Sequence, residues 1–169
     1  LMTLLIKSIN KEIGTLQKNN IRLMTIGDIQ SLPKKNQVEL KKAIDATANN
    51  TRMTLVLALS YGGRWEILEA AKSMAKKFNE NTLSESDFTE AQFELELNTS
   101  GIPNPELMIR TSGEYRISNF LLWQLAYAEL YFTDKLWPDI RKIDLYEAIL
   151  DYQNRERRFG KTSEQLQKS

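Results

Sequence analysis

Strand-length apolar segments alternate with helix-length segments along this chain, and that alternation restricts the fold more than any other feature of the sequence. Strands are predicted at residues 21–26, 53–59, 107–109 and 128–132. The spacing of apolar side chains predicts helices at residues 2–17, 34–48, 64–78, 82–97 and 143–157, with a helical turn near residues 120–125. Because helical segments separate the strands, the predicted fold class is α/β, a parallel sheet covered by helices on both faces.

The side chains of these segments also predict what is buried and where one helix begins. The apolar segment from Met53 to Leu59 is typical of a fully buried strand. Ser84 or Thr89 is expected to cap the helix at residues 82–97. One face of the helix at residues 64–78 is expected to pack in the core, and it consists of Ile67, Ala71, Met74 and Phe78.

The charge of the chain and the residue types that it lacks limit its chemistry. Its 169 residues include 23 basic and 22 acidic side chains, so no overall field attracts nucleic acid or an anionic membrane. The sequence has no cysteine and no histidine, which excludes thiolate and imidazole metal ligands and a histidine base. Any reaction must therefore use carboxylates, arginines, hydroxyls, amides or a hard metal ion.

Three of the four predicted strands end in polar or glycine-rich residues. These ends are Gly27-Asp28, the segment from Ser60 to Arg64 and the segment from Arg110 to Glu114. Ligands of open α/β sheets bind beyond the carboxyl ends of the strands, so these loops are expected at one edge of the sheet. The glycines at 62 and 63 either place the first amides of a helix toward an anion or only form a tight turn. Asp28 could likewise cap a local turn.

The loop after the third predicted strand carries the most distinctive chemistry. Arg110, Arg116 and Ser118 offer guanidinium and hydroxyl donors within one short segment. Guanidinium groups make planar, charge-assisted hydrogen bonds to phosphate oxygens and stay ionised at any accessible pH. The loop therefore suits a diphosphate. The alternative is a pair of surface arginines that pair with Glu114.

Four segments of the chain match a known family in length and order. They are IGDIQSLP at residues 26–33, LALSYGGRWEI at 57–67, PELMIRTSGEYRISNFLLWQLAYAELYFTDKLWPDI at 105–140 and NRERRFG at 154–160. They closely resemble the undecaprenyl diphosphate synthases, the bacterial cis-prenyltransferases, and the resemblance extends from residue 1 to about residue 160. It implies the cis-prenyltransferase α/β fold, a homodimer with a hydrophobic tunnel, and Mg²⁺ as cofactor.

The resemblance also implies an enzyme of isoprenoid biosynthesis. Such a transferase adds isopentenyl diphosphate units to farnesyl diphosphate with new cis double bonds. The implied product is undecaprenyl diphosphate, the C55 lipid carrier for cell-wall glycans, which is delivered to the membrane. No nucleic acid partner is expected. No apolar run approaches the length of a membrane span, so a cytoplasmic protein is expected, and peripheral contact with the inner membrane face is left open.

The family's site residues can be matched to this chain position by position. The isopentenyl diphosphate site falls on Arg110, Arg116, Ile117 and Ser118, where Ile117 would contribute its backbone. The three polar residues are also the donors that their chemistry alone indicates. The family's Mg²⁺ carboxylate falls on Glu129, and a carboxylate oxygen is a suitable ligand for this hard cation. Apart from the family, Glu129 reads as a surface residue at a strand edge.

The chain departs from the family pattern in two places. Many bacterial members have a histidine just before the second arginine of the loop, where this chain has Tyr115. The family's Asp-Gly-Asn-Gly-Arg loop and Ser-x-x-Asn-Trp-x-Arg segment are absent from these 169 residues. The expected organisation is a single cis-prenyltransferase domain, residues 1–169, that lacks its N-terminal strand, diphosphate-binding loop and first helices and ends in a polar tail at residues 161–169. No catalytic residue is expected in this chain, which by itself is expected to be inactive.

Several apolar and basic residues have two interpretations under this resemblance. Some apolar residues suit either the ordinary protein core or the lining of the prenyl tunnel. They are Leu4, Leu5, Ile9, Leu55, Val56, Leu57 and Leu59. The protein core and the dimer interface are expected to hold Trp123, Tyr127, Tyr131 and Phe132. The basic cluster either approaches the active site of the partner subunit or ends a solvated helix, and it consists of Arg155, Arg157 and Arg158.

Two other functions remain as alternatives. The first is a non-catalytic cis-prenyltransferase-like partner subunit. Such relatives lose the diphosphate-binding residues, whereas this chain keeps Arg110, Arg116, Ser118 and Glu129. The second is an unrelated phosphate-ester enzyme on a parallel sheet, which the length of the third matching segment opposes.

Overall fold

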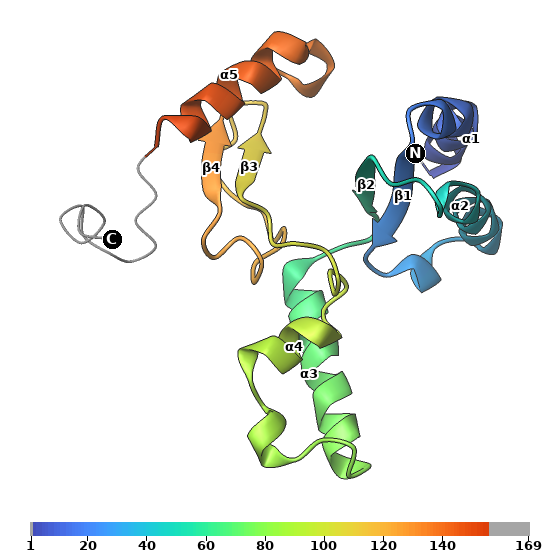
Figure 1. The fold of residues 1–169 in the computed structure, drawn as a ribbon, viewed down its shortest axis with the longest axis vertical. Coiled ribbons are helices and arrows are strands. Elements are labelled where there is room, and N and C mark those ends of the chain that lie inside the picture. Colours follow the sequence, from blue (N-terminus) through green and yellow to red (C-terminus); the bar gives the residue numbers. More distant parts are fainter. Residues whose placement is uncertain (1, 156–169) are drawn as a thin grey trace. The chain divides into compact units, whose positions relative to one another are not determined.

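The computed structural model describes residues 2–155, which divide into two compact units, unit 1 up to residue 101 and unit 2 from residue 102 onward. Unit 1 contains α1 (Met2–Lys18), β1 (Ile21–Ile26), α2 (Lys34–Thr47), β2 (Met53–Ala58), α3 (Gly63–Asn79) and α4 (Glu90–Glu96) (Figure 1). Unit 2 contains β3 (Leu107–Arg110), β4 (Glu129–Phe132) and α5 (Lys142–Gln153). Short 3-10 helices are η1 (Ile29–Ser31), η2 (Glu85–Asp87) and η3 (Trp137–Asp139). The predicted polar tail, residues 161–169, lies outside the described residues.

Each unit is built on a pair of parallel strands. β1 pairs with β2 so that Ile26 lies opposite Ala58, and β3 pairs with β4 so that Arg110 lies opposite Phe132. Within residues 2–155 these pairs are two separate two-stranded sheets. Parallel neighbours need a long crossover connection, which the segments between the strands provide. The predicted parallel α/β arrangement is therefore confirmed.

The core of unit 1 lies between α1, α2 and β1. The Thr47 hydroxyl joins α2 to β1, because it donates to the Ala43 carbonyl at 3.0 Å and accepts from the Leu23 amide at 3.0 Å. Full burial of a leucine side chain stabilises a fold by about 1.5–3 kcal/mol relative to exposure. The buried apolar residues that hold both helices on the strand are Ile6, Ile9, Leu23, Leu32, Leu40, Ala43 and Leu59.

β2 is more exposed than its apolar sequence predicts. Met53 is 51% exposed and Leu55 is 37% exposed, whereas Leu59, just beyond the strand, is buried. Within the described residues β2 has a single neighbouring strand, β1, so its second edge carries no pairing partner. The prediction of a fully buried strand at residues 53–59 is therefore wrong for Met53 and Leu55.

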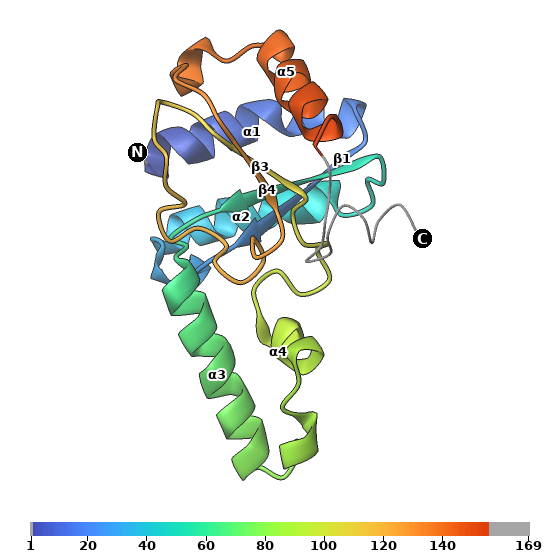
Figure 2. The same ribbon diagram turned by 90° about the vertical axis from the view of Figure 1, so that its left-hand side faces the viewer.

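α3 buries a face that differs from the predicted one. This face consists of Gly63, Glu66, Ala70 and Met74, whereas Phe78 and Ala71 are exposed. α4 lies alongside α3 (Figure 2), and Glu96 of α4 accepts a hydrogen bond from the Ser73 hydroxyl at 2.7 Å and pairs with Lys77. Polar contacts with α4 thus set the rotation of α3, and apolar periodicity does not reveal such contacts.

The helix predicted at residues 82–97 is two shorter helices. Ser84 precedes η2, and its amide donates to Asp87 Oδ2 at 2.7 Å. Thr89 begins α4 by accepting a hydrogen bond from the Gln92 amide at 3.2 Å. Both expected cap residues therefore act as caps, and the second one starts a new helix.

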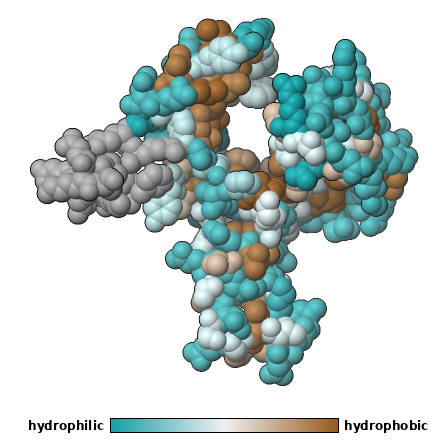
Figure 3. Space-filling view, viewed as in Figure 1, coloured by the Kyte–Doolittle hydropathy of each residue, from teal (hydrophilic) through white to brown (hydrophobic). Residues whose placement is uncertain are grey.

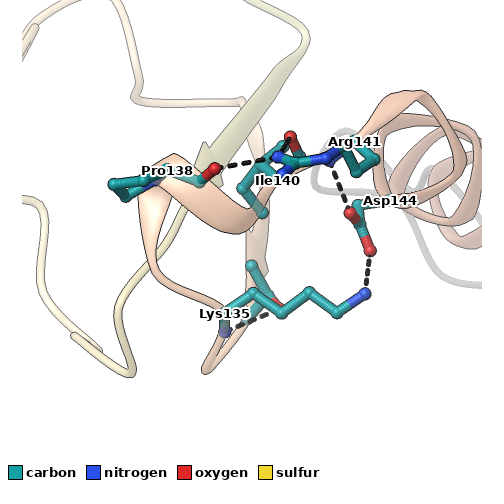
Figure 4. Close-up of polar contacts among 6 residues, drawn as sticks. Lys135, Pro138, Ile140, Arg141 and Asp144 are labelled. Carbon is teal, nitrogen blue, oxygen red and sulfur yellow. Dashed lines mark hydrogen bonds and ion pairs between the residues drawn. The ribbon is translucent and has the colours of Figure 1, made fainter.

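α5 begins at a polar junction with the segment that follows β4 (Figure 4). Asp144 Oδ2 accepts from the Arg141 amide at 2.7 Å, and Oδ1 pairs with Lys135. The Arg141 guanidinium donates to the carbonyls of Pro138 at 2.8 Å and Ile140 at 2.9 Å. The Lys135 ammonium lowers the pKa of the Asp144 carboxyl, and a carboxylate also suits the first turn of a helix. This junction fixes the position of Lys135.

Apolar side chains remain exposed on unit 2, in particular over α5 (Figure 3). Tyr127, expected in the core or the dimer interface, is 81% exposed. Large exposed apolar patches mark contact surfaces. The exposed apolar residues on and next to α5 are Leu136, Trp137, Ile143, Leu145, Tyr146 and Leu150. None of the helices formed by residues 2–155 is long and apolar enough to span a membrane.

Candidate anion-binding site

Backbone hydrogen bonds join the loop at residues 110–118 to the segment that follows β4. The Ser112 amide donates to the Lys135 carbonyl at 2.8 Å, and the Gly113 amide donates to the Thr133 carbonyl at 3.0 Å. These bonds extend the pairing of β3 with β4 beyond the ends of the strands. The first half of the loop is therefore positioned by β4 and by the junction with α5.

The loop adopts left-handed backbone conformations at residues that are not glycine. The φ angle is 72° at Ser112, 47° at Ser118 and 63° at Asn119. Such conformations cost about 1–3 kcal/mol each and gather at active sites and ligand clamps. The same conformation at Gly113 has no steric penalty, and a Cβ there would lie 3.2 Å from Asp134 Oδ1. The strained backbone is thus a second reason to place a ligand site in this loop.

Arg116 and Ser118 lie together in the second half of the loop. Arg116 Nε donates to Ser118 Oγ at 3.2 Å, and Arg116 Nη1 pairs with Glu114. The side chain of Arg116 is 66% exposed, so it is accessible to a ligand. The ion pair with Glu114, which is the alternative interpretation of the loop, thus exists for Arg116. A diphosphate bound at this point would compete with Glu114 for the guanidinium.

Arg110 differs from Arg116 because none of the carboxylates in residues 2–155 pairs with its guanidinium. It is the last residue of β3 and is half-buried. No hydrogen bond or ion pair of its guanidinium exists with any of residues 2–155. Ile117 is also half-buried, and its carbonyl accepts from the Phe120 amide at 3.0 Å. A guanidinium at a strand end that pairs with no carboxylate in the described part of the chain is a ready ligand for a phosphate group.

Glu129 lies at the opposite end of the strand pair from this loop. It is the first residue of β4 and lies opposite Leu107, whereas Arg110 lies opposite Phe132. Three residues of a strand span roughly 10 Å, at about 3.3 Å per residue. The structure therefore brings Arg116 and Ser118 into contact and places Glu129 at the opposite end of the strand pair from Arg110.

Glu129 has a cation as its partner. Arg155 Nη1 donates to Glu129 Oε2 at 2.8 Å and to the carbonyl of the next residue at 3.0 Å. Arg155 Nη2 pairs with Asp151 Oδ2 of α5 at 2.5 Å. The carboxylates of Glu129 and then Asp151 raise the pKa of Arg155. Arg155 therefore anchors the end of α5 to β4 and does not end a solvated helix, whereas Arg157 and Arg158 lie outside the described residues.

A single carboxylate matches part of what Mg²⁺ requires. This ion is usually held by one or two carboxylates together with water and substrate phosphates, and Glu129 supplies oxygens of that kind. No group of three or more acidic side chains suited to a metal occurs in the part of the chain that the structure describes. Glu129 would therefore hold Mg²⁺ together with phosphate and water oxygens, and Arg155 would have to release Oε2.

The polar strand ends of unit 1 form an internal network. The Gly27 amide donates to Asn98 Oδ1 at 2.9 Å, and the Asn98 amide donates to Glu66 Oε1 at 2.9 Å. The Tyr61 hydroxyl donates to Glu66 Oε2. Glu66 is only 1% exposed, and these donors satisfy its buried carboxylate oxygens. The sequence pattern missed Glu66, because a glutamate in the first turn of a helix is usually a solvated residue.

Asp28 and the paired glycines serve this local structure. Asp28 Oδ1 accepts from the Ser31 amide at 3.1 Å, which caps η1 as the local alternative proposed. Gly62 is the N-cap of α3, and Gly63 is its buried first residue. Because the carboxylate of Glu66 lies in this first turn, the amides there already have a negative group nearby.

The residues that are candidates for the tunnel lining differ in how deeply their side chains are buried. Ile9 and Leu59 belong to the core of unit 1, and Leu5 and Leu57 pack against it. Val56 is half-buried. Exposed apolar surface that could face a prenyl chain remains at Leu4, which is 66% exposed, and at Leu55.

Parallel strands and a strand-end loop with arginine and serine donors define an α/β protein with a candidate diphosphate site. The family model described as "Putative undecaprenyl diphosphate synthase" matches residues 1–160. The chain belongs to this prenyltransferase family.

Curated relatives agree with this assignment. The chain is 49% identical over 166 residues to an isoprenyl transferase of Chlorobaculum tepidum, a match that covers 98% of this chain and 63% of the relative. It is 48% identical over 162 residues to a ditrans,polycis-undecaprenyl-diphosphate synthase ((2E,6E)-farnesyl-diphosphate specific) of Haemophilus influenzae. That match covers 96% of this chain and 68% of the relative. The chain thus spans 63–68% of the length of these two proteins.

Solved structures show the same fold. Lavandulyl diphosphate synthase from Lavandula x intermedia, in complex with dimethylallyl diphosphate, matches with a TM-score of 0.91 and 38% identity over 95% of this chain and 70% of that chain. A probable undecaprenyl diphosphate synthase from Campylobacter jejuni matches with a TM-score of 0.81 and 35% identity over 94% of this chain and 72% of that chain. The predicted cis-prenyltransferase α/β fold is confirmed.

Proposed function

We propose that the protein containing this chain is an isoprenyl transferase. It condenses isopentenyl diphosphate with farnesyl diphosphate in cis geometry and makes undecaprenyl diphosphate, the lipid carrier precursor for cell-wall glycans. The observation that carries the proposal is the loop in which Arg110 ends β3 and Arg116 lies 3.2 Å from the Ser118 hydroxyl. The name of the Haemophilus influenzae relative supports farnesyl diphosphate as a substrate and undecaprenyl diphosphate as the product.

The residues of this chain would act by positioning one substrate. Arg110, Arg116 and Ser118 bind the diphosphate of isopentenyl diphosphate and so hold its C4 near C1 of the allylic substrate. The new bond forms between C4 and C1, the allylic diphosphate leaves with the bonding electrons, and loss of a proton from C2 restores a double bond. Fixed orientation of the two carbons lowers the barrier, and none of these residues is assigned the proton transfer.

The proposal includes a cofactor and a partner. Mg²⁺ would be held by Glu129, and when bound it neutralises charge on a diphosphate group. A homodimer is supported by the apolar side chains exposed on α5. A cytoplasmic location, with contact to the membrane surface, fits a protein that makes a membrane lipid from two charged substrates.

Incubation of the complete protein that contains this chain with Mg²⁺, farnesyl diphosphate and radiolabelled isopentenyl diphosphate tests the activity. We expect chain-elongated products that require both substrates and disappear when EDTA removes Mg²⁺. In the same assay, Glu129→Gln should keep the fold and raise the Mg²⁺ concentration needed for half-maximal rate, because a neutral amide is a poorer ligand for this cation.

Asp151→Asn is the matched control for this titration. It weakens the other ion pair of Arg155 and leaves Glu129 intact. An equal shift in Asp151→Asn, or no shift in Glu129→Gln, would mean that Glu129 only anchors Arg155. Absence of elongated product under all conditions would favour the non-catalytic partner subunit instead.

A further inference from the structure

Tyr115 directly precedes Arg116 and joins the loop to the segment that follows β4. Its hydroxyl donates to Asp134 Oδ1 at 3.1 Å. Its ring lies over Phe132 of β4, with 5.3 Å between the ring centroids and 37° between the ring planes. Tyr115 nevertheless remains 70% exposed, so these contacts do not serve the burial of its ring.

The acceptor of this hydrogen bond is itself held in place. Asp134 lies between Thr133 and Lys135, whose carbonyls accept the amides of Gly113 and Ser112. Lys135 also pairs with Asp144 at the start of α5 (Figure 4). The residue before Arg116 is therefore connected through a continuous series of contacts to a helix and a strand.

Gly113 lets the Asp134 carboxylate approach the loop closely. A Cβ at Gly113 would lie 3.2 Å from Asp134 Oδ1, which is tighter than an ordinary contact. Asp134 Oδ1 therefore lies close to the loop backbone at Gly113 and accepts from the Tyr115 hydroxyl. Contacts with the segment that follows β4 therefore hold the loop at Gly113 and at Tyr115, on either side of Glu114.

We propose that Tyr115 is a positioning residue that acts with Asp134 to hold Arg116 where it binds the diphosphate of isopentenyl diphosphate. The inference rests on the proposed function of the loop. A long, exposed arginine loses rotamer freedom when it binds an anion, and binding is weaker if the backbone beneath it must also be ordered. Tyr115 and Asp134 order that backbone before the substrate arrives.

Tyr115→Phe tests the proposal, because it keeps the ring on Phe132 and removes only the hydroxyl. We expect the KM for isopentenyl diphosphate to rise about 3- to 10-fold, as for the loss of one hydrogen bond, with a smaller change in kcat. Asp134→Ala should have the same effect. Asp134→Asn keeps an oxygen acceptor and should stay within about twofold of the wild type.

Amide hydrogen exchange supplies a readout that does not depend on turnover. The amides of Ser112 and Gly113 should exchange faster in Tyr115→Phe and Asp134→Ala than in the wild type, because their acceptors lie next to Asp134. Tyr152→Phe is the control, because it also removes a tyrosine hydroxyl that donates to a carboxylate, in this case that of Glu106, outside the loop. It should change neither the KM nor the exchange rates.

The possible outcomes separate the positioning role from the function itself. If Arg116→Ala raises the KM while Tyr115→Phe and Asp134→Ala change neither KM nor exchange, the positioning role is wrong and the proposed function stands. A loss confined to kcat in Tyr115→Phe would also overturn it. If Arg116→Ala leaves the KM unchanged, the proposed function fails together with the inference.

Discussion

Arg110→Ala and Arg116→Ala are each expected to raise the KM for isopentenyl diphosphate at least about tenfold in a protein that contains this chain. Each substitution removes charge-assisted hydrogen bonds worth roughly 1.5–3 kcal/mol, and about 1.4 kcal/mol corresponds to a factor of ten. The KM for farnesyl diphosphate should change much less. Steady-state kinetics with each substrate varied in turn measures both effects.

The surroundings of the two arginines predict a difference between them. Arg110 has no partner within residues 2–155, so Arg110→Ala removes ligand contacts without releasing a carboxylate. Arg116 must give up its ion pair with Glu114 to bind the diphosphate, which offsets part of what this arginine contributes to binding. Arg110→Ala should therefore cause the larger loss.

A third arginine serves as the control for charge alone. Arg22 lies on β1 in unit 1, where its guanidinium donates to Thr54 Oγ1 at 3.1 Å. Arg22→Ala should leave both KM values unchanged. Equal losses in all three variants, or none in Arg110→Ala and Arg116→Ala, would contradict the assignment of the loop.

The largest effect on stability is expected from Gly27→Ala. Gly27 follows β1 with a φ of 105°, and a Cβ there would lie 2.2 Å from the carbonyl oxygen of Leu59 and 3.0 Å from Tyr61 Cβ. The obstacle is backbone, so it cannot move aside cheaply. Strain at such a position costs about 1–3 kcal/mol before the collision is counted. We expect the free energy of unfolding to fall by roughly 2–4 kcal/mol in chemical denaturation.

Gly14→Ala is the matched control for this substitution. Gly14 lies within α1, where a Cβ would meet no atom within 4 Å. Alanine is favoured over glycine in a helix interior by about 0.5–1 kcal/mol, so this variant should be slightly more stable than the wild type. If Gly27→Ala proved as stable as Gly14→Ala, Gly27 would not lie as close to the backbone of Leu59 as the structure places it.

The positions of the strands could be predicted because their signals are local. Residues 21–26 and 107–109 were predicted as strands from their own apolar side chains, and β1 and β3 occupy these positions. The burial of β2 and the rotation of α3 could not be predicted in the same way. Both depend on which neighbours pack against them, and a partner such as Glu96 for Ser73 lies 23 residues away.

The chemistry of the loop was visible in the sequence, but its supports were not. Arg116 and Ser118 stand out by residue type, and the structure brings them into contact. Asp134 gives no such signal, because an exposed aspartate after a strand is common. The pair formed by Arg155 and Glu129 was also missed. A partial sign of it was available, since Asp151 and Arg155 have the spacing of an ion pair on a helix.

The most direct test of the central claim is a crystal structure of the protein with isopentenyl diphosphate bound. The diphosphate is predicted to lie in the loop at residues 110–118, with oxygens about 2.7–3.2 Å from the guanidinium nitrogens of Arg110 and Arg116 and near the Ser118 hydroxyl. Arg116 should have exchanged Glu114 for phosphate. A diphosphate bound elsewhere, with Arg116 still paired to Glu114 and Arg110 without a ligand, would contradict the account.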